Sequence, residues 1–270
     1  MPPQAISVLD EGPTGGPQET GLDVPLPPVQ DICCRVTRLV TAAAGLRIVG
    51  LTPEGGRPLD FQAGQYARLS FGGLPARDYS IASRPGDTEL EFHIRDAGGT
   101  GGSSYAVQHL QLGDRVALHG PLGRATLRTD HPGPVLGIAG GAGLAGIKSI
   151  AETALMRGHP APVHLFFGVR RSIDLYLLDH FADLARRHPN FRFVPVLSEE
   201  THPGCRTGYV GEVAAMDFTS LSGFQAYLAG PPAMVEPTVR RLLAQGIDPM
   251  DIHTDAPYIG APSLSRATAR

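Results

Sequence analysis

The pattern of hydrophobic and polar positions changes once along the chain, near residue 130. Before that point, short runs rich in β-branched and aromatic residues alternate with turns that contain Gly and Pro, which is typical of an antiparallel sandwich or barrel. Six runs predict strands: Ile32 to Val40, Leu46 to Leu51, Gln65 to Phe71, Arg77 to Ser83, Glu89 to Arg95 and Arg115 to His119. One break, from Asp96 to Tyr105, leads into a predicted short helix over Ala106 to Leu110.

After Pro134, continuous apolar runs alternate with helical patterns, which predicts a parallel sheet covered by helices on both faces. The predicted strands are Val135 to Ala139, Val163 to Gly168, Phe191 to Leu197, Gln225 to Ala229 and Ile252 to Asp255. Helices are predicted from the glycine turn to about Met156, from Asp174 to Arg187 and from Pro232 to Gln245. The predicted fold class is therefore a two-domain β plus α/β protein, with a six-stranded antiparallel barrel followed by a parallel-sheet domain.

The composition places the domain limits. Residues 1–29 are rich in Pro, Gly and polar groups and are expected to form a disordered leader. The barrel is expected over residues 30–129, the α/β domain over 130–258, and a flexible tail over 259–270.

Composition and charge exclude several classes of function. The chain is 42% hydrophobic and 18% charged, with a net charge of -3, so neither disorder nor nucleic-acid binding is expected. No run is long enough to span a membrane, and the N-terminus lacks the pattern of a signal peptide, which favours a cytoplasmic protein. The three cysteines, Cys33, Cys34 and Cys205, have no metal-ligand spacing, so no metal site is expected. A plant-type iron–sulfur cluster needs four.

Arg77, Tyr79 and Ser80 form the first candidate for chemistry. A guanidinium can bind a diphosphate through paired charged hydrogen bonds. Two residues on, the tyrosine ring faces the same side of the strand and can lie against a flat ring system. The serine hydroxyl can then bond a ring nitrogen. The alternative is a half-buried strand with a surface arginine.

The glycine-rich break is the second candidate. Glycines that run into Gly102 and Ser103 at a helix start can bind an anion through free backbone N–H groups. The alternative is an ordinary flexible loop in which Ser103 caps the helix.

Four successive strand ends in the second half carry short glycine-containing or charged strings. Strand, glycine turn and helix is the arrangement that places a dinucleotide pyrophosphate at a helix N-terminus. The first string is Gly140, Gly141, Ala142 and Gly143, which is not the usual Gly-x-Gly-x-x-Gly spacing. The residues singled out at the other three ends are Gly168, Arg170, Glu199, Gly230, Pro231 and Met234.

These strings, in this order with Gly64-Gln65-Tyr66 and Gly120 to Gly123, resemble the ferredoxin-NADP reductase family over residues 30–258. The resemblance is greatest to the reductase components of bacterial aromatic-ring dioxygenases, which typically carry an additional iron–sulfur module with four cysteines. It implies FAD on the barrel and NADH in the α/β domain. Arg77 and Ser103 would bind the FAD diphosphate, and Tyr79 and Ser80 would hold its reactive ring. His93, Ile94 and Arg95 would line the FAD by backbone and charge.

The sequence departs from the family pattern at several positions. Ala142 stands where Thr is frequent, Ala229 replaces a cysteine near the nicotinamide, and Pro257 replaces one of two C-terminal aromatics. Tyr258 is the aromatic that remains, as a candidate to cover the flavin.

The resemblance implies a flavin-dependent oxidoreductase that passes electrons from NADH to a ferredoxin or the iron–sulfur component of an oxygenase. One alternative is a diaphorase, or a free-flavin or quinone reductase, with a diffusible acceptor. The other is a non-catalytic regulatory subunit that keeps the fold. Glu199 favours NADH over NADPH, since a carboxylate repels a 2′-phosphate and can accept hydrogen bonds from ribose hydroxyls.

Overall fold

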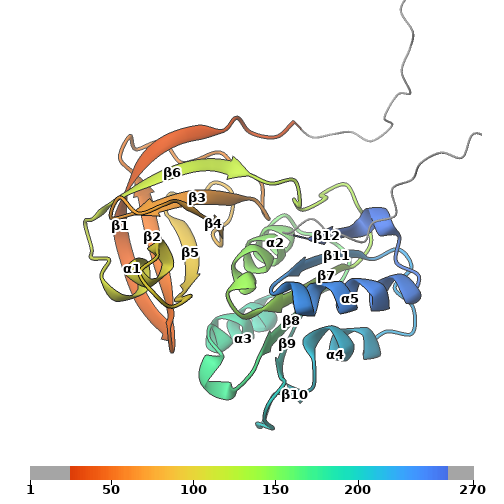
Figure 1. The fold of residues 1–270 in the computed structure, drawn as a ribbon. Coiled ribbons are helices and arrows are strands. Elements are labelled where there is room, and N and C mark those ends of the chain that lie inside the picture. Colours follow the sequence, from red (N-terminus) through yellow and green to blue (C-terminus); the bar gives the residue numbers. More distant parts are fainter. Residues whose placement is uncertain (1–24, 255–270) are drawn as a thin grey trace, which may run out of the picture.

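The computed structural model describes residues 25–254 and contains two six-stranded sheets side by side (Figure 1). The first sheet is antiparallel, and its strand order is β4-β3-β6-β1-β2-β5. Its elements are β1 (Gln30–Ala43), β2 (Leu46–Pro53), β3 (Tyr66–Phe71), β4 (Arg77–Ser80), β5 (Leu90–Arg95), α1 (Gly102–Gln108) and β6 (Arg115–Leu122). A single bridge between Ile81 and Phe92 joins the segment after β4 to β5, so the sheet nearly closes.

The second sheet is parallel, with the order β10-β9-β8-β7-β11-β12. Its strands are β7 (Val135–Gly140), β8 (Val163–Val169), β9 (Phe191–Leu197), β10 (Arg206–Thr207), β11 (Gln225–Ala229) and β12 (Ile252–Thr254). Its helices are η1 (Gly141–Gly143), α2 (Leu144–Met156), η2 (Ser172–Asp174), α3 (Leu178–Arg187), α4 (Val210–Met216), α5 (Pro232–Ala244) and η3 (Pro249–Asp251). The predicted fold class is confirmed.

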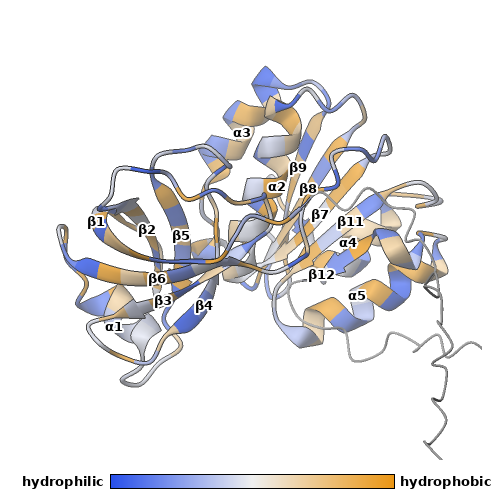
Figure 2. Cartoon of the chain, turned by 90° about the horizontal axis from the view of Figure 1, so that it is seen from above, coloured by the Kyte–Doolittle hydropathy of each residue, from blue (hydrophilic) through white to orange (hydrophobic). Residues whose placement is uncertain are grey.

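Burial explains the layers. Helices α2 and α3 pack on one face of the parallel sheet, and α4 and α5 pack on the other, each through a separate cluster of buried apolar residues. The central strands are apolar on both faces, as the hydropathy colours of Figure 2 show, while the helices present polar residues outward. The barrel has its own core, which includes Phe71, Phe92 and Leu118.

Helix α2 also faces the barrel. Leu46, Ile48 and Ala63 of the barrel belong to the same buried cluster as Ile147 and Ile150 of α2. The two sheets therefore share a continuous apolar contact, and the position of α2 relative to the barrel is fixed by packing.

Two predicted helices begin elsewhere. Helix α1 starts at Gly102 and not at Ala106, so Ser103 lies inside its first turn, and the capping residue Gly101 makes no side-chain cap. Helix α3 starts at Leu178 and not at Asp174. The reason is local: Leu177 has a left-handed φ of 59°, and the preceding Tyr176 turns its side chain into the buried interior. Strand β10 and helix α4 were not predicted.

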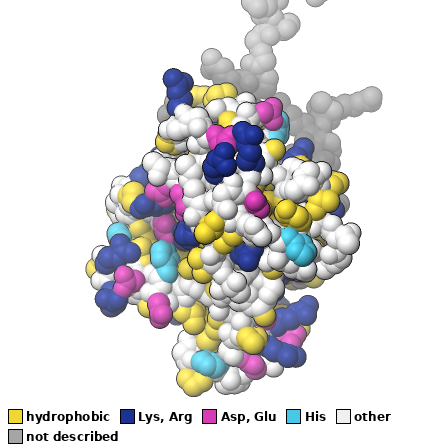
Figure 3. All heavy atoms as spheres, turned by 90° about the vertical axis from the view of Figure 1, so that its left-hand side faces the viewer, with side chains coloured by type: hydrophobic (Ala, Val, Ile, Leu, Met, Phe, Trp, Pro, Cys, Tyr) yellow, Lys and Arg dark blue, Asp and Glu magenta, His cyan; other side chains and the backbone are white. Residues whose placement is uncertain are grey.

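Outside the core, charges are mixed. Figure 3 shows the barrel side of the molecule, with basic and acidic side chains intermingled. Among the surface pairs of the barrel, Glu54 pairs with Arg35 and Arg115, and Glu89 pairs with Arg38. Such exposed pairs contribute little to stability, about 0–1 kcal/mol each. This face offers no broad patch of one sign.

The connection between the sheets is anchored by Tyr227 of β11. Its buried hydroxyl accepts from the backbone N–H of Arg128 at 2.8 Å and lies 2.7 Å from Gln225 Oε1 and 3.3 Å from the carbonyl of Thr126. Burial raises the pKa of Tyr227, so the hydroxyl keeps its proton at neutral pH. One side chain thus ties the linker to the parallel sheet.

We expect Tyr227→Phe to lower the free energy of unfolding by about 1–3 kcal/mol, because the buried Oε1 of Gln225 loses its donor and the Arg128 N–H loses its acceptor. Urea unfolding followed by circular dichroism measures this change. Tyr209→Phe is the matched control, since Tyr209 is 70% exposed. Equal stability of the two variants would show that Tyr227 does not anchor the linker.

Candidate functional site

Strand β4 presents Arg77 and Tyr79 on one face and Asp78 on the other, since side chains alternate along a strand. Asp78 is paired across the hairpin with Arg68 at 2.9 Å. Arg77 is exposed, and within residues 25–254 its guanidinium has no ion pair or hydrogen bond. Among the described residues, Arg77 is therefore the cation of this hairpin that remains available to an anion from outside.

Tyr79 lies between the surface and the barrel core. Its ring packs edge-on against Phe71, with the ring centroids 5.8 Å apart. The hydroxyl is buried and has no hydrogen-bond partner among the described residues, and burial raises its pKa. An unsatisfied buried hydroxyl costs about 1–3 kcal/mol, which a bound group with a suitable acceptor or donor would recover.

The glycine-rich loop before α1 is organised around an anion of its own. The carboxylate of Asp96 accepts from the Gly98 N–H at 2.8 Å, from Ser104 Oγ at 2.5 Å and from Gln108 Nε2 at 2.7 Å. These bonds lower the pKa of Asp96. Ser103 Oγ accepts from the Ala97 N–H at 3.4 Å. Sequence reasoning assigned this loop to a phosphate and missed the acidic residue that orders it.

A cleft of about 1120 Å³ opens at the carboxyl ends of the parallel strands, where ligands of open α/β sheets bind. The volume exceeds the usual range of about 300–1,000 Å³ for small-molecule sites. Eight residues that the sequence singled out line this cleft: Gly140, Gly141, Gly143, Gly168, Arg170, Gly230, Pro231 and Met234. Arg95 joins them from the barrel, so both sheets contribute to the cleft.

Two of these glycines are required by close approach. A Cβ on Gly143 would lie 2.4 Å from the carbonyl oxygen of Ala229, which is rigid backbone. A Cβ on Gly168 would lie 2.6 Å from the Cβ of Val210. The strand ends and the helix starts therefore meet only because side chains are absent, and this keeps the floor of the cleft open.

Glu199 lies beside the cleft without being part of its lining. Its carboxylate is 3.6 Å from Arg170 Nε and 3.4 Å from Arg171 Nε. The neighbouring Glu200 accepts from the Ser172 N–H at 2.5 Å, and these contacts lower its pKa. Two cations and two anions thus share this edge, so the local charge is balanced.

Several residues of the cleft were not found from the sequence. Tyr209, Glu212 and Arg241 also line the cleft, and Glu212 pairs with Arg241. Asp174 also lines the cleft, and its carboxylate is 3.8 Å from the Arg95 guanidinium. The feature of the sequence that could have revealed Tyr209 and Glu212 is the string Gly208-Tyr209-Val210-Gly211, a further glycine-containing turn before a helix. Helix α4 itself is only seven residues long and gives no helical period.

The side chains of His93 and Ile94 are both buried. Ile94 belongs to the barrel core. The His93 ring bonds Glu91 Oε1 at 2.9 Å through Nε2 and the Tyr176 hydroxyl at 3.0 Å through Nδ1. Only the backbone of these two residues is left to line a ligand on the barrel, whereas the Arg95 side chain reaches the cleft.

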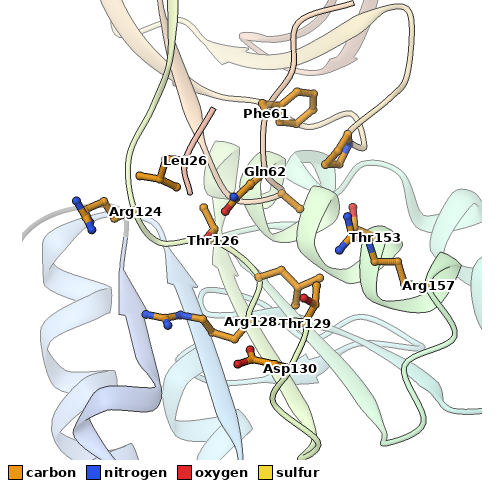
Figure 4. Close-up of a pocket in the computed structure, with 13 residues that line it drawn as sticks. Leu26, Phe61, Gln62, Arg124, Thr126, Arg128, Thr129, Asp130, Thr153 and Arg157 are labelled. Atoms are coloured by element: carbon orange, nitrogen blue, oxygen red, sulfur yellow. The ribbon is translucent and has the colours of Figure 1, made fainter. Parts of the chain in front are cut away.

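A second cavity of about 190 Å³ lies at the seam between the sheets (Figure 4). Leu26, Phe61 and Gln62 border it on the barrel side, and Arg157 approaches from α2. It contains none of the predicted site residues and is smaller than the sites that hold cofactors. The cleft at the strand ends is therefore the stronger candidate.

Three further predictions concern a metal site, a membrane span and the C-terminal residue Tyr258. Among residues 25–254, no group of three or more His, Cys, Asp and Glu side chains has the geometry to hold a metal ion. Within the same range, no helix is both long and apolar enough to cross a bilayer. Tyr258 lies outside the described residues.

Comparison with known proteins places the chain in a family. Residues 138–240 match the family model of the oxidoreductase NAD-binding domain. The reductase component of the naphthalene 1,2-dioxygenase/salicylate 5-hydroxylase systems of Ralstonia sp is 43% identical over 203 residues, which is 75% of this chain and 62% of the relative. The aromatic O-demethylase reductase subunit of Amycolatopsis is 40% identical over 236 residues, which is 84% of this chain and 70% of the relative.

Solved structures agree. An Amycolatopsis cytochrome P450 reductase matches with a TM-score of 0.79 and 40% identity over 84% of this chain and 69% of that chain. The ferredoxin reductase in carbazole 1,9a-dioxygenase matches with a TM-score of 0.78 and 29% identity over 87% and 71%. The chain spans about three fifths of the length of the first curated relatives, 62% in both cases. With the cleft, the two sheets and these likenesses together, the chain belongs to the ferredoxin-NADP reductase-like family of oxidoreductases with an NAD-binding domain.

Proposed function

We propose that the chain is an FAD-dependent NADH oxidoreductase that delivers electrons to a separate iron–sulfur protein of an oxygenase system. One observation carries the proposal: the glycine-lined cleft at the ends of β7, β8 and β11 faces Arg95 of the barrel. A dinucleotide in this cleft would therefore reach a second ligand held on the barrel. The relatives, whose names describe ferredoxin–NAD(P)+ reductase components, support the same reading.

The residues present on the barrel fit FAD. Arg77 is a free, exposed cation within the described residues, and Tyr79 has an unsatisfied buried hydroxyl beside it. Arg77 would hold the diphosphate, with Gly102 and Ser103 at the start of α1 as its second contact. Tyr79 and Ser80 would orient the ring. When bound, the flavin supplies the hydride acceptance and single-electron donation that protein side chains lack.

The α/β domain would hold the nicotinamide dinucleotide. Gly140, Gly141, Gly143 and Gly230 leave its backbone open to close approach, and Arg95 adds positive charge for the phosphates. Strand β11 ends at Ala229, and Gly230 and Pro231 follow it, so the described lining of the cleft contains no thiol at this point. These groups bind and orient the donor and shield the reacting atoms from water.

The domain limits and the cellular location follow from this proposal. We assign residues 30–129 to the flavin unit and residues 130–258 to the nicotinamide unit, with the linker near Arg128 between them; residues 255–258 lie outside the described range. The three cysteines are free thiols, as is usual in a reducing compartment, which favours the cytoplasm.

We expect the purified protein to be yellow, to release FAD on acid extraction, and to bleach when NADH is added without oxygen. Electron transfer to cytochrome c should rise on addition of a ferredoxin. Absorbance spectra and stopped-flow kinetics measure both. A colourless protein that gains no flavin on incubation with FAD would contradict the proposal, and rates indifferent to ferredoxin would favour a diffusible acceptor.

Arg77→Ala should weaken FAD binding by about 1.5–3 kcal/mol, because a charge-assisted contact to the diphosphate is lost. The variant should still unfold cooperatively, since Arg77 is exposed. Fluorescence titration of apoprotein with FAD measures the affinity. Arg68→Ala is the matched control on the same hairpin, because Arg68 is occupied by Asp78. Equal affinities of the two variants would refute the role of Arg77.

The choice between NADH and NADPH depends on the edge beside Gly168. Glu199 disfavours a 2′-phosphate, but Arg170 and Arg171 lie within 4 Å of its carboxylate and offset the charge. Both arginines are more than 60% exposed, so solvent screens them strongly. We propose that NADH is preferred.

The expected preference is roughly one to two orders of magnitude in kcat/KM, which is about 1.4–2.7 kcal/mol in the transition state. Glu199→Arg should narrow it by removing the repulsion. Steady-state kinetics with both nucleotides provide the measurement, with Asp179→Arg, on the exposed start of α3, as the charge-reversal control. If the wild-type protein used NADPH better than NADH, the choice of nucleotide would depend on Arg170 and Arg171 and not on Glu199.

A further inference from the structure

A buried row of polar groups joins the barrel to the glycine turn. Glu91 and His93 lie on β5, Tyr176 follows η2, and Gly141 begins the turn η1 at the floor of the cleft. Glu91 Oε1 is 2.9 Å from His93 Nε2, and His93 Nδ1 is 3.0 Å from the Tyr176 oxygen. The Tyr176 hydroxyl lies 3.3 Å from the Gly141 carbonyl oxygen. The row therefore crosses the seam between the sheets without interruption.

The protons in this row can be counted. The Gly141 carbonyl can only accept, and Tyr176 has a single hydroxyl proton to give. Burial raises the pKa of Tyr176, so the hydroxyl stays protonated. Burial also works to raise the pKa of Glu91, but the hydrogen bond from His93 and the charge of Lys148 outweigh it and hold that pKa well below its usual range. Glu91 is thus an acceptor too, and Nε2 of His93 must carry a proton in either charge state.

Two arrangements satisfy these constraints. With a neutral His93, Nδ1 is an acceptor, and the Tyr176 hydroxyl donates to it and not to Gly141. With a protonated His93, Nδ1–H donates to the Tyr176 oxygen, and the hydroxyl is free to donate to the Gly141 carbonyl. The direction of one hydroxyl therefore depends on one buried proton.

Charged and titratable groups face His93 and Tyr176 from every neighbouring element. On His93, burial lowers the pKa below its usual value, Glu91 opposes this, and the cations Lys148 and Arg38 add to it. On the Tyr176 side lie Arg95, which lines the cleft, and Asp174. The Asp174 carboxylate is 3.8 Å from the Arg95 guanidinium. Two further carboxylates lie one contact away from the row: Glu89, paired with Arg38, and Glu152, paired with Lys148 and His180. At neutral pH the neutral arrangement is the expected one.

The hydroxyl matters because of the peptide that it reaches. In a planar trans peptide the N–H points opposite to the carbonyl, so a bond to the Gly141 carbonyl also fixes the N–H of Ala142. Ala142 lines the cleft. Gly141 has a left-handed φ of 56° and no side chain, and glycine is the residue with the widest backbone freedom. The Leu144 N–H is the other donor to this carbonyl.

We infer that His93 and Tyr176 are positioning residues for the nicotinamide dinucleotide, with the Tyr176 hydroxyl fixing the glycine turn when His93 carries a second proton. The inference rests on the proposed function, since it assigns the ligand of the same cleft. Binding would be tighter to the protonated form and would raise the pKa of His93. Affinity then increases as the pH falls through the pKa of the bound state, and it levels off below that of the free state.

Nitrogen NMR of the FAD-loaded protein, labelled at histidine, tests the proton positions without any turnover. The expected neutral form of His93 carries its proton on Nε2, with a midpoint below about pH 6.5. Addition of NAD+ should move the midpoint upward. A neutral form protonated on Nδ1, or a midpoint that NAD+ does not move, would overturn the inference.

Calorimetric titration with NAD+ from pH 5 to pH 8 tests the consequence. We expect the wild-type Kd to fall about 3- to 10-fold over this range as the pH is lowered, the size of one hydrogen bond. Tyr176→Phe should reduce this ratio below about twofold, whereas His180→Gln, which alters a half-buried histidine of the same network, should keep it. An unchanged ratio in Tyr176→Phe overturns the inference alone. No binding of NAD+ to the wild type at any pH overturns the proposed function, and the inference with it.

Discussion

The buried ammonium of Lys148 is the contact on which the arrangement of the two sheets depends. It is 6% exposed and lies between Glu91 of the barrel, at 3.3 Å, and Glu152 of its own helix, at 3.2 Å. It also donates to the carbonyl of Ala82 at 3.2 Å. Removing one member of a buried pair leaves an uncompensated charge, at a cost of about 3–5 kcal/mol. The seam is therefore specific in a way that apolar packing alone is not.

This contact matters for the cleft because Lys148 lies on α2, one turn after the glycine turn η1. The neighbouring Ser149 donates to the carbonyl of Ser83 at 2.6 Å, so two successive residues of α2 hold the segment that follows β4. The strand that carries Arg77 and Tyr79 and the turn that carries Gly141 are thus fixed to the same helix. Two ligands bound to these elements would have a defined relative position, as transfer between them requires.

The same seam shows how a barrel and a parallel sheet can share one function. Each has apolar residues of its own, one apolar cluster spans the boundary, and the polar groups beside that cluster are paired across it. Such mixed seams are typical of contacts between domains, which are less apolar than domain interiors. The polar network brings ionisable groups of both units together: Glu91 and His93 come from the barrel, and Lys148 and Tyr176 come from the α/β domain. A change of protonation in one unit can therefore reach the backbone of the other.

The sequence by itself determined the elements and their kinds. Strands Phe191–Leu197 and Gln225–Ala229 have the predicted limits, and the glycine turn at residues 140–143 leads into a helix as expected, because apolar runs and glycines act over a few neighbouring residues. Only the tertiary structure decided which distant groups meet. His93 faces Tyr176 across 83 positions of the chain, and Tyr209 comes to the cleft from a helix too short to show a period. Asp96 orders the loop before α1 through side-chain bonds that the local pattern did not show. Helix α3 begins only after Leu177, whose φ is left-handed, because the preceding Tyr176 is buried in the seam. Periodicity reports burial along one element, whereas partner choice depends on packing between elements, which a single sequence does not encode locally.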